Sequence, residues 1–149
     1  MNALAVTHVA GCPLCEDSGG RLVHEAAKFR VICAAEAGFP AFYRLVWRDH
    51  VREFSDLQKD DRLLCTEAVT VIEKAMRDLL APGKINLATL GNVVPHLHWH
   101  VIARYDWDSH FPSPVWAGAQ RERAQSREAE VAAKLPALEA RIIERLRSI

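Results

Sequence analysis

KINLATLGNVVPHLHWHVIARY occupies residues 84–105, and its three histidines, at positions 96, 98 and 100, are spaced by two. In an extended strand side chains alternate between faces, so these imidazoles would share one face and lie roughly 7 Å apart. In a helix the same spacing would scatter them, because each residue turns by about 100°. The stretch therefore predicts a strand with a row of histidines, His96, His98 and His100, and an opposite apolar row, Leu97, Trp99 and Val101.

A neutral histidine that donates a hydrogen bond from one ring nitrogen presents the other nitrogen as a nucleophile or base. The pattern His-φ-His-φ-His-φ-φ, in which φ is apolar, is the signature of the histidine-triad (HIT) superfamily, and residues 96–102 resemble it in full. The resemblance extends over about residues 12–105. It implies an α+β fold with an antiparallel meander sheet of about five strands, one long helix on one face and a C-terminal helical segment.

The resemblance also implies a nucleotide hydrolase or transferase. In the family the middle histidine, here His98, attacks an α-phosphorus and forms a nucleotidyl-histidine intermediate. His100 would donate hydrogen bonds to phosphate oxygens, and His96 completes the expected catalytic set. Asn86 resembles the family's asparagine that contacts the phosphate or leaving group, although it could instead satisfy strand or turn backbone. Trp99 is also an expected substrate contact.

Several substrates fit the resemblance. The asparagine and glycine before the triad and the N-terminal cysteine pair are most similar to bacterial triad proteins that hydrolyse dinucleoside polyphosphates. Phosphoramidase activity is one alternative, and a nucleotide-binding module without turnover is another. Cys33 stands roughly where family members carry an acid or amide that holds the ribose hydroxyls, and a thiol replaces a carboxylate poorly.

Cys12 and Cys15, three residues apart, can bind one metal ion through a tight turn. In related family members with this cysteine pair, the positions of His50 and His96 complete a Cys2His2 site, so the resemblance implies structural zinc. In the alternative, the cysteines are free thiols and His96 binds phosphate or supports His98. One ion bound by all three triad histidines would need heavy distortion, because zinc–nitrogen distances are about 2.0–2.1 Å.

Composition restricts the broad class of protein. A chain of 149 residues suits one domain, 1–149, here with a core at about 12–105, a loop at 106–118 and a helical extension at 119–149. Its 19 basic and 19 acidic residues balance, which argues against binding to a nucleic-acid polymer. The first fifteen residues lack the features of a signal peptide, and no apolar run approaches the roughly 20 residues of a membrane span. We therefore expect a cytoplasmic protein with reduced thiols or a bound metal.

Other segments predict the elements around the triad strand. Three short strands are expected as an antiparallel meander, at residues 21–23, 28–34 and 41–47. Ser55 and Gln58 have the form of a capping box, which predicts a helix from Ser55 to the Pro82-Gly83 pair. The apolar stripe of this helix should cover the sheet face that carries Leu97 and Trp99.

The remaining expectations concern the second half of the chain. Residues 85–90 and 93–104 predict a hairpin across a two-residue turn at Gly91-Asn92. Residues 106–116 form a loop that either closes over the active site or packs against a second subunit. Residues 120–149 are helical in character, with an interruption at Pro136. The family resemblance implies a homodimer, with interface area from three tryptophans that could instead be core: Trp99, Trp107 and Trp116.

Overall fold

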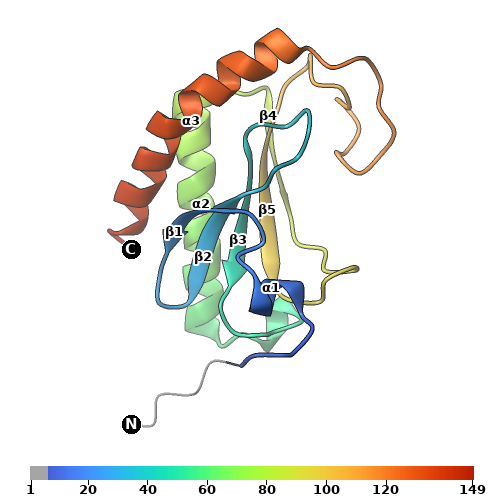
Figure 1. Cartoon of the computed structure of the whole chain (residues 1–149). Coiled ribbons are helices and arrows are strands. Elements are labelled where there is room, and N and C mark those ends of the chain that lie inside the picture. The colour runs from blue at the N-terminus through green and yellow to red at the C-terminus, as the bar shows by residue number, and fades with distance from the viewer. Residues whose placement is uncertain (1–6) are drawn as a thin grey trace.

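The computed structural model describes residues 7–149, which form an α+β fold around one antiparallel sheet of five strands (Figure 1). The strands are β1 (Arg21–Glu25), β2 (Phe29–Cys33), β3 (Phe42–Trp47), β4 (Lys84–Ala88) and β5 (His98–Arg104). The helices are α1 (Pro13–Glu16), a 3-10 turn η1 (Phe54–Asp56), α2 (Lys59–Leu80) and α3 (Gln125–Leu146). The predicted fold class is confirmed.

The triad strand lies inside the sheet. The strand order is β1-β2-β3-β5-β4, so β5 is hydrogen-bonded on both sides and β4 forms one edge. None of the helices within residues 7–149 combines the length and the apolar character needed to cross a membrane. The expectation that the chain lacks a signal peptide rests in part on residues 1–6, which lie outside the described residues.

Strand alternation divides the sheet into two faces with different roles. On β5, Trp99, Val101 and Ala103 point to the face that α2 covers, where they join one large hydrophobic core. Leu97 belongs to the same core, so the predicted contact of the long helix with the Leu97 and Trp99 face is confirmed. The opposite face carries the histidines and is covered by the N-terminal segment and loops instead of a long helix.

The long helix begins later than the sequence predicts. The backbone N–H of Glu53 donates to the Asp56 carboxylate at 3.3 Å, and this contact closes the short turn η1 around Ser55. The chain is extended at Leu57, whose side chain enters the core, and α2 starts only at Lys59. The prediction of Ser55 as the N-cap is therefore wrong. Ser55 lies inside the separate turn η1, and the extended backbone at Leu57 divides that turn from α2.

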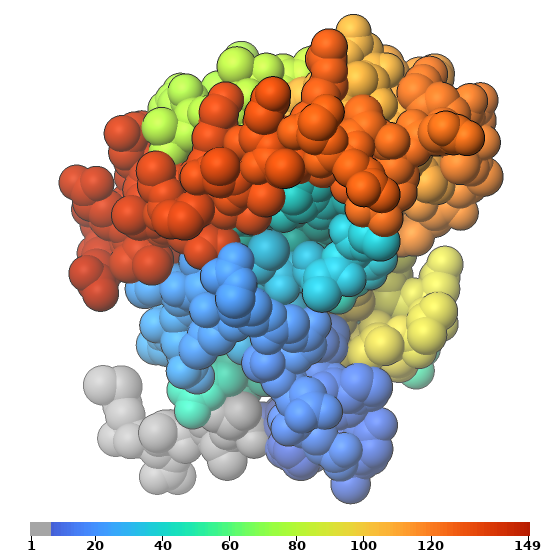
Figure 2. Space-filling view, turned by 45° about the horizontal axis from the view of Figure 1, so that its top comes forward, coloured from blue at the N-terminus to red at the C-terminus, as the bar shows by residue number. Residues whose placement is uncertain are grey.

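The C-terminal helix is continuous, contrary to the predicted interruption at Pro136. Proline removes one helical hydrogen bond, but the helix α3 buries Val131, Leu138, Ile142 and Leu146 in the common core. This burial holds the helix in one piece across the proline. The helix packs against α2, and the space-filling view shows it as a ridge over the upper part of the molecule (Figure 2).

The hairpin before the triad has a long loop instead of a two-residue turn. Ala88 and His100 are the last paired residues of β4 and β5 at that end, so residues 89–97 connect the strands. The backbone near the triad bonds elsewhere: the N–H of Leu97 donates to the Val51 carbonyl at 2.7 Å. Pro95 has no N–H to contribute to a ladder. These features explain why the predicted turn at Gly91-Asn92 does not form.

Candidate active site and metal cluster

The three triad histidines lie on the same sheet face, as the spacing predicts. His98 and His100 are paired with Val46 and Arg44 of β3, and His96 lies two residues before the start of β5. The rings of His98 and His100 are 5.0 Å apart and nearly perpendicular, with an interplanar angle of 79°. All three histidines are buried, so their hydrogen-bond partners determine which ring nitrogen remains available.

The neighbouring carbonyl fixes the tautomer of His98. Its Nδ1 lies 2.6 Å from the backbone oxygen of His96. A carbonyl oxygen only accepts hydrogen bonds, so Nδ1 carries the proton and Nε2 of the neutral ring has a free lone pair. Burial lowers the pKa of His98, which favours this neutral form. The ring can therefore act as a nucleophile through Nε2.

His100 has the complementary arrangement. Arg44 Nε donates to His100 Nδ1 at 3.3 Å, and because arginine is only a donor, the proton of the neutral ring must sit on Nε2. Burial, together with the charges of His98 and Arg44, lowers the pKa of His100 to about 4. His100 is thus a neutral hydrogen-bond donor beside the lone pair of His98.

These two rings open onto a cavity of about 560 Å³. Its wall is formed by Pro13 and Leu14 of α1, Arg44 of β3, residues 90–94 and the half-exposed Trp116. The ring of Trp116 lies 5.1 Å from that of His100, in an edge-on contact. The cavity can therefore hold a ligand in contact with both histidines and an aromatic ring.

Sequence reasoning missed Arg44, Asn92 and Trp116 as cavity residues. One signal was available: Arg44 is the single charge within an otherwise apolar strand, and its position in the strand puts it on the histidine face. Asn92 and Trp116 stand in irregular loops, where no periodicity reveals the direction of a side chain.

Trp99, an expected substrate contact, and Cys33, which stands near the family's ribose position, both lie on the core side of the sheet. Trp99 lies between His98 and His100 in β5, so alternation turns it to the α2 face, where its ring is 5.6 Å from that of Phe54. Cys33 also lies within the core, and burial raises the pKa of its thiol. Neither side chain borders the cavity that His98 and His100 share.

Asn86 is on the histidine face but does not border the cavity. Its side-chain oxygen accepts a hydrogen bond from Arg104 Nη1 at 2.8 Å. The same arginine forms a fully buried ion pair with Asp108, with an Nε–Oδ2 distance of 2.8 Å. Asn86 thus belongs to a polar network beside the site, and its contact with phosphate stays a prediction.

This network fastens the loop of residues 106–116 to β5. Burial alone would raise the pKa of Asp108, but Arg104 and the backbone N–H groups of Tyr105 and His110 lower it below the usual value. The carboxylate accepts those N–H groups at 3.1 and 3.0 Å. A charged, multiply bonded aspartate therefore anchors the loop whose far end presents Trp116 to the cavity.

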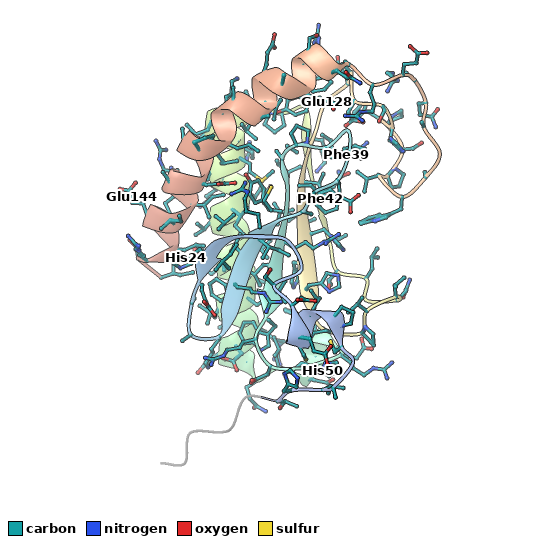
Figure 3. The ribbon with its side chains drawn as sticks, in the orientation of Figure 1. His24, Phe39, Phe42, His50, Glu128 and Glu144 are labelled. Atoms are coloured by element: carbon teal, nitrogen blue, oxygen red, sulfur yellow. The ribbon has the colours of Figure 1, made fainter. Side chains whose placement is uncertain are left out.

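A second cluster lies at the other end of the histidine row. The ligand atoms of Cys12, Cys15, His50 and His96 all lie within 4.8 Å of one another. Cys12 caps α1, Cys15 lies within it, and His50 follows β3 beside that helix (Figure 3). The structure thus brings together all four residues that the sequence analysis grouped as metal ligands.

The distances in this cluster fit a tetrahedral ion. The Sγ of Cys15 lies 3.4 Å from Nδ1 of both His50 and His96, and Cys12 Sγ lies 3.5 Å from His96 Nδ1. A zinc ion at about 2.3 Å from sulfur and about 2.0–2.1 Å from nitrogen would place these atoms about 3.5 Å apart. These three sulfur–nitrogen distances therefore match a tetrahedral zinc site.

His96 is directed away from the cavity. Its Nε2 donates to the Trp47 carbonyl at 2.6 Å, which leaves the Nδ1 lone pair facing the two cysteines. The ring does not border the cavity that His98 and His100 share. Of the three expected catalytic histidines, the structure therefore brings two to the cavity and one to the metal cluster.

Comparisons with known proteins agree with this geometry. The family model for the HIT domain matches residues 17–107, more than half of the chain. A histidine triad protein of Marinobacter aquaeolei VT8 is 28% identical, with a TM-score of 0.67 over 84% of this chain and 92% of that one. One from Bradyrhizobium japonicum is 26% identical, with the same TM-score over 84% and 92% of the two chains.

A zinc-bound histidine triad family protein of Mycobacterium smegmatis shares the fold, with 17% identity and a TM-score of 0.58 over 87% of this chain and 96% of that one. No protein with a curated description matches the sequence. The match to the HIT domain covers β1 to β5 and includes both histidines that border the cavity. The chain therefore belongs to the HIT family.

Proposed function

We propose that the protein is a hydrolase or transferase that acts at the α-phosphate of nucleotide conjugates, of which dinucleoside polyphosphates are the preferred class. One observation carries the proposal: a lone pair on His98 and an N–H on His100 face the same cavity, each fixed by a partner on its other nitrogen. Attack at phosphorus needs a nucleophile and a donor for the charged oxygens, and these rings supply one each.

In the proposed reaction, His98 Nε2 attacks the α-phosphorus and forms a P–N bond while the bond to the leaving group's bridging oxygen breaks. The Nδ1–H bond to the His96 carbonyl stabilises the charge that the ring gains. His100 Nε2–H donates to a non-bridging oxygen as negative charge develops there. Water then attacks the nucleotidyl-histidine, which releases the nucleoside monophosphate and restores His98.

We further propose that the four-residue cluster holds one structural zinc ion. Cys12, Cys15, His50 and His96 would fill all four tetrahedral positions, so the ion has no open position for substrate. The ion would hold α1 against the start of β5. Because Pro13 and Leu14 border the cavity, this link would also keep the cavity wall in place.

A homodimer formed through β4 is the assembly that we propose. β4 is an edge strand with an exposed Leu87, and unpaired edge strands readily pair with another chain. Trp99 and Trp107 are partly buried against the core of their own chain. Light scattering at micromolar concentration should give twice the chain mass, and the mass of a single chain would contradict the dimer.

The catalytic proposal is tested by offering purified protein three substrates: a diadenosine polyphosphate, an adenosine phosphoramidate and adenylylated sulfate. We expect release of AMP from the polyphosphate, with a covalent nucleotidyl group on His98 after rapid quenching. Turnover of the phosphoramidate alone would identify a phosphoramidase instead. Binding of AMP without turnover of any conjugate would identify a nucleotide-binding module.

A further inference from the structure

Arg44 is a charged side chain that the proposed reaction does not yet use. It lies on β3 directly opposite His100, among apolar residues that fill the rest of the strand. Its side chain is 22% exposed and borders the same cavity as His98. A partly buried charge lowers stability unless it is paired, so the partners of Arg44 decide whether its role is structural alone.

The guanidinium of Arg44 retains donors for a ligand. Its Nε is bonded to His100, and among residues 7–149 its other polar partner is Glu36, with Nη2 and Oε1 3.5 Å apart. The Glu36 side chain is 49% exposed, and ion pairs of this kind contribute little. A guanidinium has five N–H groups and binds phosphate oxygens in pairs. A phosphate can therefore displace Glu36 at small cost.

Packing also restricts the orientation of this group. The central carbon of the guanidinium, Cζ, lies 5.3 Å from the centre of the Phe42 ring, a cation–π contact. Together with the bond to His100, this contact holds Arg44 at the triad instead of in solvent. The cavity thus contains a fixed cation one strand away from the proposed nucleophile.

We propose that Arg44 binds the phosphate next to the scissile one, so that the site selects conjugates whose leaving group carries a further phosphate. The inference rests on the proposed function, because it takes the α-phosphate to lie between His98 and His100. As the P–O bond breaks, negative charge passes to the leaving phosphate, and Arg44 neutralises it. A conjugate with an uncharged leaving group has no such partner and gains nothing from Arg44.

The test compares the affinities for ADP and AMP by calorimetry, because the two differ by this one phosphate. Charge-assisted hydrogen bonds to a phosphate predict that the wild type binds ADP about tenfold or more tightly than AMP. In Arg44→Gln the ratio of the affinity for ADP to the affinity for AMP should fall to about one, even if the affinity for AMP itself changes. Arg44→Lys keeps the charge without the paired donors and should be intermediate.

Two further variants control for net charge. Arg77→Gln removes the same charge from the exposed surface of α2, on the other side of the sheet, and should keep the wild-type ratio. Glu36→Gln removes the competing carboxylate and should raise the affinity for ADP, by roughly twofold to threefold given the usual strength of exposed pairs. Circular dichroism of each variant confirms that the fold is kept.

The results separate this inference from the proposed function. Equal affinities of the wild type for AMP and ADP, or an unchanged ratio in Arg44→Gln, would overturn the inference and leave Arg44 as a positioning residue for His100. If the ratio collapses as expected while the wild type turns over no conjugate, the phosphate site stands and the hydrolase proposal fails. If conjugates are turned over, Arg44→Gln should reduce kcat/KM more for the diadenosine polyphosphate than for the phosphoramidate.

Discussion

The two ends of the histidine row differ in the ring nitrogen that the backbone occupies. At one end, Nε2 of His96 donates to the Trp47 carbonyl at 2.6 Å, and Nδ1 faces two thiols. At the other end, Nδ1 of His98 donates to the His96 carbonyl, also at 2.6 Å, and Nε2 faces the cavity. Spacing by two puts the rings on one face, but the carbonyl partners decide their chemistry.

The two ends of the histidine row also differ in how far their surroundings enclose them. His96 has relative exposure of 0% and is enclosed by residues that can complete a metal site. His98 and His100 are walled by loops that leave space for a ligand. A closed end suits a structural role and an open end suits catalysis, so substitutions at the two ends should have separable effects.

The largest expected effect is the loss of turnover in His98→Asn. Asparagine keeps a polar side chain of modest size but cannot form the covalent intermediate, so kcat should fall at least about 10³-fold. Nucleotide affinity should change little, because the cavity remains. His96→Asn is the matched variant at the closed end and should lose the metal instead. Retained turnover in His98→Asn, with a nucleotidyl group trapped on another residue, would contradict the assignment.

The next effect is the loss of stability when the cysteines are replaced. Purified protein should carry about one zinc per chain, and Cys12→Ser combined with Cys15→Ser should remove it. If the ion stabilises the fold by roughly 3 kcal/mol, Tm should fall by about 10 °C. Cys33→Ala, which removes a thiol from the other sheet face, should keep the metal. If protein expressed with zinc available is metal-free yet fully stable and active, the zinc proposal is wrong and the two cysteines are free thiols.

At the open end, His100 should make stability depend on pH. Its folded-state pKa of about 4 lies below the usual 6.5, so the folded chain binds fewer protons than the unfolded chain between these values. Stability is therefore complete above about pH 6.5 and falls as pH decreases toward 4. The loss attributable to this ring is at most about 3 kcal/mol.

Chemical denaturation of the wild type and His100→Gln at each pH isolates this contribution. Glutamine keeps an acceptor for Arg44 but does not titrate. The free energy of unfolding of the wild type, relative to that of the variant, should therefore fall as the pH decreases from about 6.5 toward 4. A constant difference would show that protonation of His100 does not affect folding. If the proposed zinc ion is released at low pH, its loss would affect both proteins and cancel in the comparison.

Alternation in the strand explains what the sequence predicted correctly at the triad. The same rule should have excluded Trp99 as a substrate contact, because a residue between two cavity histidines faces the core. The cluster of Cys12 and Cys15 with His50 and His96 joins segments up to 84 positions apart, and only the family resemblance suggested it. Spacing within one segment says nothing about such distant contacts.

The wrong boundaries share a physical cause, which is that tertiary contacts overruled local signals. Pro136 should end a helix by its own chemistry, but the core contacts of α3 on both sides keep the helix intact. The turn at Gly91-Asn92 was displaced because backbone groups near the triad bond to residues 47 and 51 instead. Arg44 was visible in the sequence as an isolated charge, but its role depends on its partner across the strand.

The smallest expected effect concerns Trp116 at the outer wall of the open end. The residue is 53% exposed and its ring contacts His100, so it offers a surface for stacking without supporting the core. Trp116→Ala should lower nucleotide affinity by about fivefold to tenfold, at the weak end of base–aromatic stacking, and leave Tm unchanged.

Trp107→Ala is the matched control for this loop. That ring stacks on Tyr105 at 4.7 Å and packs against the core, so its removal should lower Tm and leave nucleotide affinity unchanged. If Trp116→Ala instead keeps its affinity and loses the dimer mass in light scattering, the loop serves the subunit interface. The open end would then be bounded by a second chain instead of by its own tryptophan, and the contrast with the closed end would depend on assembly.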